Sequence, residues 1–415
     1  MKNLTTSLLI LFGSISIFAQ SDSILFLGNS YTYTSDLPGK FKSLAEGAGK
    51  SVFIDSYTPG GKQLSQHYVD AASISKINAH QWNYVVLQEQ SQMPLINPNA
   101  TITNAQNIMT DYIKVNNPCT EVVMYMTWAR KEGNSWLKQI NYTHDQMATY
   151  YEDFYEDIWK YTAGRVSAVG KAFHEATRQG INIYSGDGSH QNADGTYLAA
   201  CVFYATLYKE TPVGLTFSSA SSESVKTKLQ QIAHDIVMTD LYEHNITKIR
   251  WTMSKTSLNM GEIVSFTEGI YMFPFPNNFL WDFEGANTTS STAENPSNIQ
   301  YDTQGNYDVK LTIQDECGYT ESRKLTDTVT VLISTGINDI ENNQIFLYPS
   351  LVNDNQSITI NGHTFEDIKS NLKIIDLVGN TIPYSISQNK INLTSNFKGA
   401  AFFHLNGKTT KVIYQ

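Results

Sequence analysis

The sequence contains few cysteines, and their number and positions exclude two kinds of protein. Among 415 residues there are three, Cys119, Cys201 and Cys317. An odd number at scattered positions is neither a disulfide framework nor a metal-binding motif, so each is expected to be a small buried apolar residue. A bridge between Cys119 and Cys201 stays open as an alternative, because an oxidising compartment would permit it.

Other motifs are also missing. The sequence has no HExxH zinc motif and no glycine-rich phosphate loop, so no metal and no other cofactor is expected. The formal net charge of −10 argues against nucleic acid as a partner and gives no sign of a basic membrane-binding surface. Charged residues make up only 16 % and hydrophobic residues 41 %, a composition that builds folded cores rather than a disordered chain.

Long apolar runs are absent after the first residues. Lys2 supplies a positive charge, and residues 8–18 form an apolar stretch that is too short to span a bilayer. We therefore expect residues 1–19 to be a signal peptide that is cleaved after Ala19. No later segment reaches transmembrane length, so the sequence predicts an exported protein without an integral membrane segment.

Residues 20–245 alternate between short apolar runs and stretches with helical spacing. Helices are expected to close this region at 197–208 and 223–244. Such alternation predicts an α/β domain with a mostly parallel sheet covered by helices. The expected strands are residues 24–27, 52–57, 84–87, 121–127 and 166–169.

From about Lys248 the helical periodicity gives way to β-rich runs such as YDVKLTI (307–313) and DTVTVLI (327–333). Gly and Asn turns separate these runs, a pattern typical of a β-sandwich. The stretch WDFEG at 281–285 opens a segment that resembles the PKD-type domain, which we expect at residues 246–335. The later positions that match this family are Tyr301, Gly305, Tyr307 and Gly318.

Residues 336–415 begin with a linker, TGINDIENNQ, and continue with IFLYPSLVNDNQSITI. This part resembles the C-terminal sorting domain of type IX secretion in Bacteroidetes, with Tyr348-Pro349-Ser350-Leu351 where that family usually has YPNP. The basic residues that commonly end the family are absent. The resemblance implies a second small all-β sandwich, the type IX secretion machinery as a partner, and a secreted or cell-surface location.

Two short stretches carry the residue types of nucleophilic catalysis. Gly28-Asn29-Ser30 ends the first strand, and the carboxyl end of a parallel strand is where α/β proteins display a nucleophile. Gly28 and Asn29 are expected to adopt backbone angles that other residues avoid. Asp187 and His190 are three residues apart, a spacing that lets a carboxylate orient an imidazole. Taken alone, each stretch is also compatible with an ordinary turn or a helix cap.

Together the two stretches resemble the SGNH (GDSL-type) hydrolases, nearest to a branch that carries GNSYT and LQEQS. The resemblance spans residues 21–245. It implies a three-layer α/β/α fold with a flavodoxin-like, five-stranded parallel sheet. It also implies Ser30 as the nucleophile, His190 as the general base and then acid, and Asp187 as the residue that orients His190.

An ester hydrolase also needs donors for the oxyanion of its tetrahedral intermediate. The resemblance implies the backbone N–H of Ser30 and a glycine of SYTPGGKQL, for which we prefer Gly61 to Gly60. The asparagine that the family carries after the third strand is absent, because that strand ends YVVLQEQSQMP. We expect Gln88 to replace it, with Gln90 as the alternative.

The remaining candidate residues are expected to line the substrate site: Asn29, Tyr31, Gln90, Trp128 and Arg130. The expected activity is that of a secreted serine esterase. The leading substrate is an O-acetylated polysaccharide, because exported proteins with PKD-type modules often handle glycans. The alternatives are a lipid or aryl esterase, and a glycan-binding, adhesin-like protein with an inactive hydrolase domain. Fold-level analogy cannot decide among them.

Overall fold

The computed structural model describes residues 21–332 and seven shorter stretches of the C-terminal region. The expected signal peptide and the linker TGINDIENNQ lie outside the described residues. The chain divides into two compact units, Met1–Ile333 and Ser334–Gln415. The shorter stretches are 346–348, 351–352, 357–361, 365–387, 390–393, 397–405 and 408–414.

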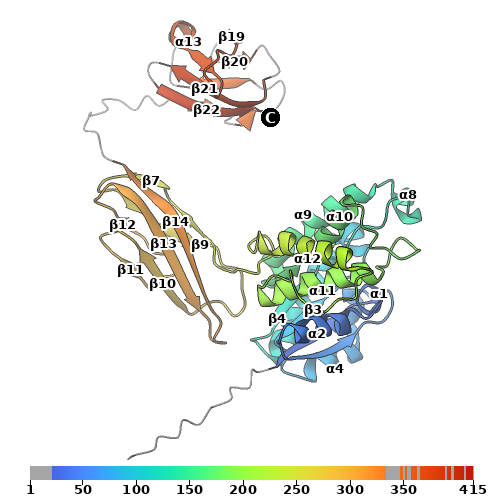
Figure 1. Cartoon of the computed structure of the whole chain (residues 1–415). Helices are drawn as coiled ribbons and strands as arrows, with labels where there is room; N and C mark the ends of the chain where they lie inside the picture. The colour runs from blue at the N-terminus through green and yellow to red at the C-terminus, as the bar shows by residue number, and fades with distance from the viewer. Residues whose placement is uncertain are drawn as a thin grey trace, which may run out of the picture. The chain divides into compact units, whose positions relative to one another are not determined.

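A parallel sheet of five strands forms the centre of the amino-terminal part of the first unit, where Figure 1 labels its strands β3 and β4. Its order is β2-β1-β3-β4-β5, the arrangement of flavodoxin-like folds. The predicted α/β fold with a parallel sheet is therefore confirmed. The strands are β1 (Asp22–Leu27), β2 (Val52–Tyr57), β3 (Tyr84–Leu87), β4 (Glu121–Tyr125) and β5 (Arg165–Ser167).

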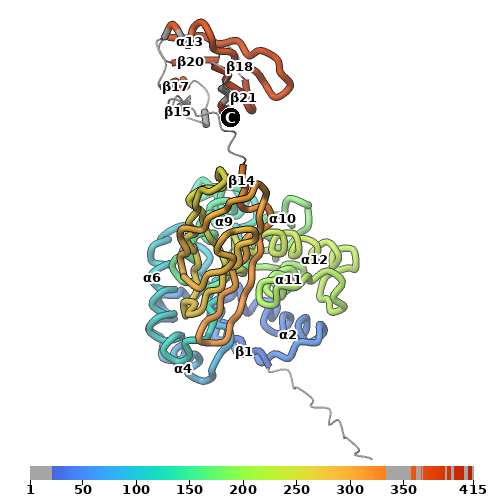
Figure 2. Tube along the Cα trace, turned by 90° about the vertical axis from the view of Figure 1, so that its left-hand side faces the viewer, coloured from blue at the N-terminus to red at the C-terminus, as the bar shows by residue number. Residues whose placement is uncertain are grey.

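Helices cover both faces of this sheet, because alternate side chains of each strand point to opposite faces. Ile24 and Phe26 of β1 belong to one core, whereas Leu25 and Leu27 belong to the other. Figure 2 shows α4 and α6 on one side and α2, α11 and α12 on the other. The first core is covered by α2 (Leu37–Gly47), α10 (Val169–Arg178), α11 (Ala193–Tyr208) and α12 (Glu223–Met238).

The second core is covered by α3 (Leu64–Val69), α4 (Ala71–Asn78), α6 (Pro98–Ile108), the π-helix η1 (Met109–Ile113) and α9 (His144–Thr162). Four short helices lie in connections: α1 (Ser30–Tyr33), α5 (Met93–Ile96), α7 (Lys114–Asn116) and α8 (Ser135–Ile140). We call the region from β1 to α12 the α/β domain.

The last helix of the α/β domain is shorter than the sequence predicts. The expected helix runs to His244, but α12 ends at Met238. The Asp240 carboxylate accepts hydrogen bonds from the backbone N–H groups of Tyr242 and Glu243. A side chain that binds nearby backbone donors in this way competes with helix formation, and a turn replaces the last expected helical turns.

The rest of the first unit, residues 251–332, is called the β domain here. Its main sheet has the order β11-β10-β13-β14-β7, and two two-stranded sheets accompany it. Trp281 and Phe283 of β10 are buried in its core. Its strands are β6 (Trp251–Met253), β7 (Ser257–Asn259), β8 (Ile263–Val264), β9 (Phe266–Glu268), β10 (Asn278–Phe283), β11 (Ser290–Ser291), β12 (Ile299–Gln300), β13 (Gly305–Gln314) and β14 (Thr320–Leu332).

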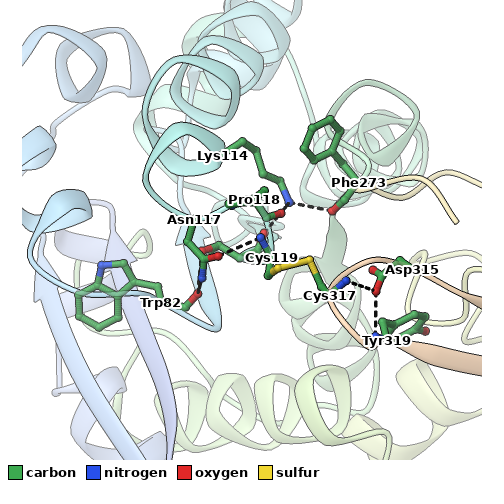
Figure 3. Close-up of a disulfide and its surroundings, with 10 residues drawn as sticks. Trp82, Lys114, Asn117, Pro118, Cys119, Phe273, Asp315, Cys317 and Tyr319 are labelled. Carbon is green, nitrogen blue, oxygen red and sulfur yellow. Dashed lines mark hydrogen bonds between the residues drawn. A yellow bond between two sulfur atoms is a disulfide. The ribbon is translucent and has the colours of Figure 1, made fainter. Parts of the chain in front are cut away.

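A disulfide between Cys119 and Cys317 joins the α/β domain to the β domain (Figure 3). Cys201 is free and buried within α11. The expectation of a small buried residue is confirmed for Cys201, but it is wrong for Cys119 and Cys317, and the alternative Cys119–Cys201 bridge is wrong as well. Cys119 lies in the turn before β4 and Cys317 in the turn between β13 and β14. The distance between the two turns depends on how the domains pack, which cysteine spacing does not encode.

Polar contacts surround this disulfide. The backbone N–H of Cys119 donates to Asn117 Oδ1 at 3.0 Å, and that of Cys317 donates to Asp315 Oδ1 at 2.9 Å. Lys114 Nζ donates to the carbonyl oxygen of Phe273 in the β domain at 2.8 Å (Figure 3). Both cysteine turns are thus held by their own side chains, and a lysine bridges the two domains beside them.

A buried ion cluster continues this junction at the amino-terminal edge of the sheet. The Glu121 carboxylate lies 2.8 Å from Arg165 Nη2 and 2.8 Å from Lys248 Nζ. Burial alone would raise the pKa of Glu121, but Arg165 and Lys248 outweigh it and lower that pKa to about 2. The carboxylate is therefore charged at any physiological pH and ties Lys248, which leads into the β domain, to the sheet.

The second unit contains two four-stranded sheets, β15-β17-β20-β19 and β16-β22-β21-β18. One helix, α13 (Phe365–Asn371), accompanies them. Its strands are β15 (Phe346–Tyr348), β16 (Leu351–Val352), β17 (Ile358–Asn361), β18 (Lys373–Ile375), β19 (Tyr384–Ser387), β20 (Lys390–Leu393), β21 (Gly399–Leu405) and β22 (Lys408–Tyr414). Across the described residues of both units, no helix combines the length and apolar character needed to cross a membrane.

Candidate active site

Ser30 occupies the first position of the short helix α1, directly beyond the end of β1. Asn29 caps this helix, and its Oδ1 accepts a hydrogen bond from the backbone N–H of Tyr31 at 3.2 Å. Neither Gly28 nor Asn29 has a positive φ, so the expected reason for these residues is wrong. Gly28 is required for space instead: a Cβ there would lie 2.6 Å from both Gln88 Oε1 and Thr32 Oγ1.

His190 and Asp187 approach Ser30 from a loop 160 residues away in the sequence. His190 Nε2 lies 2.9 Å from Ser30 Oγ, and His190 Nδ1 lies 2.5 Å from Asp187 Oδ2. Asp187 Oδ1 accepts the backbone N–H groups of Ser189 and His190 at 2.9 and 3.0 Å. Burial would raise the pKa of the Asp187 carboxyl, but its hydrogen bonds with His190 and these N–H groups outweigh burial and lower that pKa. The structure therefore brings together all three predicted catalytic residues.

The segment after β4 holds this loop in place. Trp128 Nε1 donates to the carbonyl oxygen of Ser189 at 3.0 Å. The backbone N–H of Lys131 donates to the carbonyl oxygen of Gly188 at 2.8 Å. Asn134 Nδ2 donates to the carbonyl oxygen of Asp187 at 3.1 Å. Three points of attachment fix the loop against the sheet, so His190 is positioned by the scaffold.

Two residues that line the same cavity, Ser30 and Gly61, carry backbone donors that are candidates for the oxyanion. In the part of the chain that the structure describes, neither the N–H of Ser30 nor that of Gly61 donates to an acceptor. Gly61 has a φ of +69°, a left-handed conformation that favours glycine. Asn29 Nδ2 donates to the carbonyl oxygen of Lys62 at 2.9 Å and so ties the Gly61 turn to the Ser30 turn. Gly61, and not Gly60, lines the cavity beside Ser30.

Gln88, the preferred third oxyanion donor, is a buried supporting residue instead. It is fully buried. Its Oε1 accepts hydrogen bonds from the Asn29 N–H and from Thr32 Oγ1 at 2.8 and 2.9 Å, and its Nε2 donates to Asn29 Oδ1 at 2.9 Å. Gln88 Nε2 also donates to the carbonyl oxygen of Glu89. These contacts use the whole amide behind the Ser30 turn, so the expectation for Gln88 is wrong.

Gln90, the alternative, does line the cavity. Its backbone N–H donates to Glu89 Oε1 at 2.6 Å, and its Nε2 donates to Gln92 Oε1 at 3.3 Å. An amide has two N–H donors on its nitrogen, so Gln90 keeps one for a bound molecule. The carboxylate of Glu89, which the sequence analysis did not single out, fixes the backbone of Gln90 and also accepts the N–H of Leu64 at 3.0 Å.

The cavity around these residues has a volume of about 320 Å³. Trp128 does not line it, contrary to expectation: it is 1 % exposed and stacks between the rings of Tyr31 and Phe173 at centroid distances of 4.2 and 4.3 Å. A neighbouring aromatic residue, Trp136, lines it instead. The complete lining consists of Asn29, Ser30, Tyr31, Gly61, Gln90, Ser91, Arg130, Asn134, Ser135, Trp136, Asp187, Ser189 and His190.

Arg130 lies on the wall of this cavity. Its Nη1 donates to Ser189 Oγ at 2.8 Å, and that hydroxyl also lies 2.8 Å from the Tyr31 hydroxyl. The guanidinium carbon lies 5.3 Å from the centre of the Trp136 ring, within the range of a cation–π contact. Arg130 belongs to TWARKEG (127–133), a run that follows the fourth expected strand and so predicts a position at the same edge of the sheet as Ser30. Trp136 lies beyond that run, and no motif marks it.

Comparison with known proteins identifies the β domain. The model of the PKD domain family matches residues 249–331, and the expected PKD-type domain is therefore confirmed. A search among curated protein sequences finds no match to this chain.

Solved structures that are similar to this chain share the α/β architecture. A protein from Slackia heliotrinireducens, provisionally named an SGNH hydrolase, is 25 % identical, with a TM-score of 0.39 over 44 % of this chain and 97 % of that one. A DUF4886 family protein from Bacteroides uniformis is 19 % identical, with a TM-score of 0.45 over 54 % and 96 %. A variant of an acetyl xylan esterase from Geobacillus stearothermophilus is 11 % identical, with a TM-score of 0.33 over 47 % and 96 %. The roles of the site residues must be argued from their own geometry.

Proposed function

We propose that this protein is a serine esterase of the SGNH type that hydrolyses carboxylic esters. One observation carries the proposal: Ser30, His190 and Asp187 form a continuous chain of hydrogen bonds at the edge of a cavity. Asp187 accepts the Nδ1 proton of His190, which leaves Nε2 free to accept the proton of Ser30. A nucleophile, a base and an orienting carboxylate in this order are the requirements of acyl transfer.

In the first half of the reaction, Ser30 Oγ attacks the carbonyl carbon of the ester while its proton moves to His190 Nε2. The carbonyl oxygen becomes an oxyanion, and the N–H groups of Ser30 and Gly61 and the amide of Gln90 donate to it. When the intermediate collapses, the bond to the alcohol oxygen breaks. The alcohol takes the proton from His190 and leaves an acyl group on Ser30.

In the second half, a water molecule attacks the acyl carbon and gives a proton to His190 Nε2. The same donors stabilise the second oxyanion. The bond between Ser30 Oγ and the acyl carbon then breaks, and His190 returns the proton to Ser30. Asp187 stays charged throughout, consistent with its lowered pKa, and stabilises the imidazolium that forms twice in each cycle.

The lining of the cavity supports a short acyl group on a polar alcohol. Apart from the aromatic rings of Tyr31 and Trp136, every described lining residue is polar, charged or glycine. A long acyl chain would find no aliphatic wall to bury against, which removes the main favourable term for binding it. Polar side chains such as Asn134 and Gln90 suit hydroxyl groups. An O-acetylated polysaccharide is thus the preferred substrate, ahead of lipid and aryl esters.

We also propose that the chain is exported and that residues 336–415 direct its delivery to the outside or to the cell surface. The apolar segment at residues 8–18 and the sorting-domain resemblance support this. The Cys119–Cys317 disulfide adds support, because such bonds persist in oxidising compartments. Deleting residues 338–415 should leave the esterase active but block its delivery. Normal secretion of the shortened chain would contradict the sorting role.

The test of the activity uses the chain from residue 20 onward and p-nitrophenyl esters of two, four and eight carbons. Ser30→Ala should lower turnover by a factor on the order of a million, since removing the nucleophile of a triad has about that effect. Ser43→Ala, on α2, serves as the matched serine control and should keep full activity. A fluorophosphonate probe should label the wild type on the peptide that contains Ser30.

Acetate hydrolysis that depends on Ser30 and falls with chain length would support deacetylation, and release of acetate from acetylated xylan would extend it to glycans. A preference for the eight-carbon ester would move the substrate to lipids. A folded protein that neither hydrolyses any ester nor reacts with the probe would refute the esterase. That result would favour the glycan-binding alternative.

A further inference from the structure

Three metal-ligating side chains meet outside the proposed active site. His144 and Asp145 occupy the first turn of α9, and His174 lies on α10. One ligand atom from each of the three lies within 4.8 Å of the others. His174 Nε2 and Asp145 Oδ1 are 3.3 Å apart. Two ligands of a tetrahedral zinc ion with bonds of about 2.0–2.1 Å are separated by about 3.3–3.4 Å, so this pair already has the spacing that an ion requires.

The His144 imidazole is oriented as a metal ligand usually is. Its Nδ1 lies 2.9 Å from the carbonyl oxygen of Arg130, which can only accept, so Nδ1 carries the proton. Its Nε2 then has a free lone pair, and it is buried with no hydrogen-bond partner among the described residues. The residue is 4 % exposed. A backbone carbonyl that takes the other ring proton fixes the tautomer of metal-bound histidines in the same way.

The His174 imidazole has the second common support. Its Nδ1 lies 2.7 Å from Oε1 of Glu152, a residue of the neighbouring helix α9. A carboxylate on the far nitrogen of a histidine raises its basicity and aims the near nitrogen at the ion. The Asp145 side chain is 77 % exposed, so the third ligand faces solvent. A buried histidine, a supported histidine and an exposed carboxylate form a site that is closed on one side and open on the other.

We propose that His144, Asp145 and His174 bind one divalent transition-metal ion. Zn²⁺ is the ion that two imidazoles and a carboxylate suit, with water as the fourth ligand. The ion would relieve the unpaired nitrogen of His144, because a buried polar group without a partner costs free energy. It would also join α9 to α10 next to the segment that holds the proposed active-site loop.

The site links to the cavity through Arg130. The carbonyl oxygen of Arg130 holds His144, and the guanidinium of the same residue holds Ser189, next to His190. The ion is therefore a structural support for this segment and takes no part in the ester chemistry. The sequence predicts no metal because His174 lies 29 residues from Asp145 in no known motif. Only the packing of α9 against α10 brings the ligands together.

The test measures metal binding directly, so it does not depend on esterase activity. The untagged full chain, stripped with a chelator, is titrated with Zn²⁺ in a calorimeter and with Co²⁺ under visible absorption. We expect one ion per chain and the absorption of four-coordinate Co²⁺. Zn²⁺ should also raise the melting temperature, because a ligand that binds only the folded state stabilises it.

Asp145→Asn should lower the Zn²⁺ affinity at least tenfold without unfolding the protein, because this side chain is exposed. Glu152→Gln should lower it about 10–100-fold, because it removes the carboxylate that supports the Nδ1 atom of His174. Asp153→Asn is the matched control, an exposed aspartate on the same helix, and should bind as the wild type does.

Several results would overturn the site. One is the absence of stoichiometric binding, which would leave His174 as the centre of an ordinary ion-pair cluster. Another is an affinity that Asp145→Asn and His174→Gln leave unchanged. A third is loss of the ion in His190→Gln alone, which would place it between His190 and Asp187 in the proposed active site.

Discussion

Asn29 and Gln88 form two hydrogen bonds with each other behind Ser30. The Asn29 N–H donates to Gln88 Oε1 at 2.8 Å, and Gln88 Nε2 donates to Asn29 Oδ1 at 2.9 Å. Asn29 lies just beyond the end of β1 and Gln88 just beyond the end of β3, two neighbouring strands of the sheet. The position of Ser30 therefore depends on Gln88, a residue that does not itself line the cavity.

Gln88→Ala should destabilise the fold by about 2–4 kcal/mol, because it leaves buried donors on Asn29 and Thr32 without acceptors. Urea unfolding followed by tryptophan fluorescence measures this. Gln90→Ala is the comparison, since Gln90 is partly exposed, and it should change the free energy of unfolding by less than about 0.5 kcal/mol. Equal losses in the two variants would contradict the supporting role of Gln88.

Gln90→Ala should instead lower kcat. If its amide donates to the oxyanion, removing one such donor typically lowers the rate about 10²–10³-fold. The fall should appear in kcat with acetate esters while KM changes little, because the donor acts mainly in the transition state. A normal kcat would leave Ser30 and Gly61 as the two proposed donors.

Asp187→Asn should lower kcat by about 10⁴ with the fold intact. Asparagine Oδ1 can still accept the N–H groups of Ser189 and His190, but its Nδ2 would donate to His190 Nδ1. The imidazole would then carry its proton on Nε2 and could not accept the proton of Ser30. Steady-state kinetics and a melting curve check both halves of this prediction, and a loss below tenfold would exclude Asp187 from the orienting role.

His67 should make stability depend on pH. It is buried with Nε2 on the carbonyl oxygen of Gly28, and burial lowers its pKa from 6.5 to about 4. Above pH 6.5 both folded and unfolded chains have a neutral imidazole. As the pH falls from 6.5 to 4 only the unfolded chain gains the proton, so the folded state loses up to about 3 kcal/mol.

The check compares urea unfolding of the wild type and His67→Gln at pH 7 and pH 4.5. Groups other than His67 titrate in both proteins and cancel. The stability difference between the two should shrink by about 2–3 kcal/mol at the lower pH. A difference that stays constant would mean that His67 takes up its proton over the same pH range in the folded and unfolded chains.

The cysteines give a chemical test of the domain junction. The denatured, unreduced chain should show one reactive thiol, that of Cys201, and the reduced chain three. Replacing Cys119 and Cys317 by serine should cost about 2–5 kcal/mol of stability. Turnover should survive, because the disulfide is remote from Ser30. Cys119 lies at the amino ends of the parallel strands, before β4, whereas Ser30 lies at their carboxyl ends, after β1. Three thiols before reduction would rule out the disulfide.

The sequence was sufficient to predict the parallel sheet and to single out Ser30, Asp187 and His190, which the structure brings together. The apolar runs at 24–27 and 84–87 lie in β1 and β3, because buried parallel strands must be apolar on both faces. The Ser30 turn and the Asp187–His190 spacing are local patterns, and the carboxyl edge of the sheet brings them together. The catalytic roles assigned to them remain predictions.

What the sequence did not reveal depends on partners from distant segments. Gln88 and Gln90 are both glutamines that follow the same strand, so the sequence does not distinguish them. Only the path of β1 decides which of the two contacts Asn29. Trp128 follows a strand as a pocket residue would, yet the rings of Tyr31 and Phe173 enclose it. Cys317 and His174 likewise acquire their neighbours from the packing of separate elements.

The Cys119–Cys317 bond also decides how the molecule carries a mechanical load. It joins residues 198 positions apart, a length of chain that would span about 650–710 Å if fully extended. A force that pulls the two ends apart passes through the sulfur atoms and bypasses that whole segment. Asp187 and His190 lie inside the ring that the disulfide closes, whereas Ser30, on α1, lies outside it in the segment that bears the force. A stretched molecule would therefore lose Ser30 by extraction of β1 while the half of the site that holds His190 stayed folded.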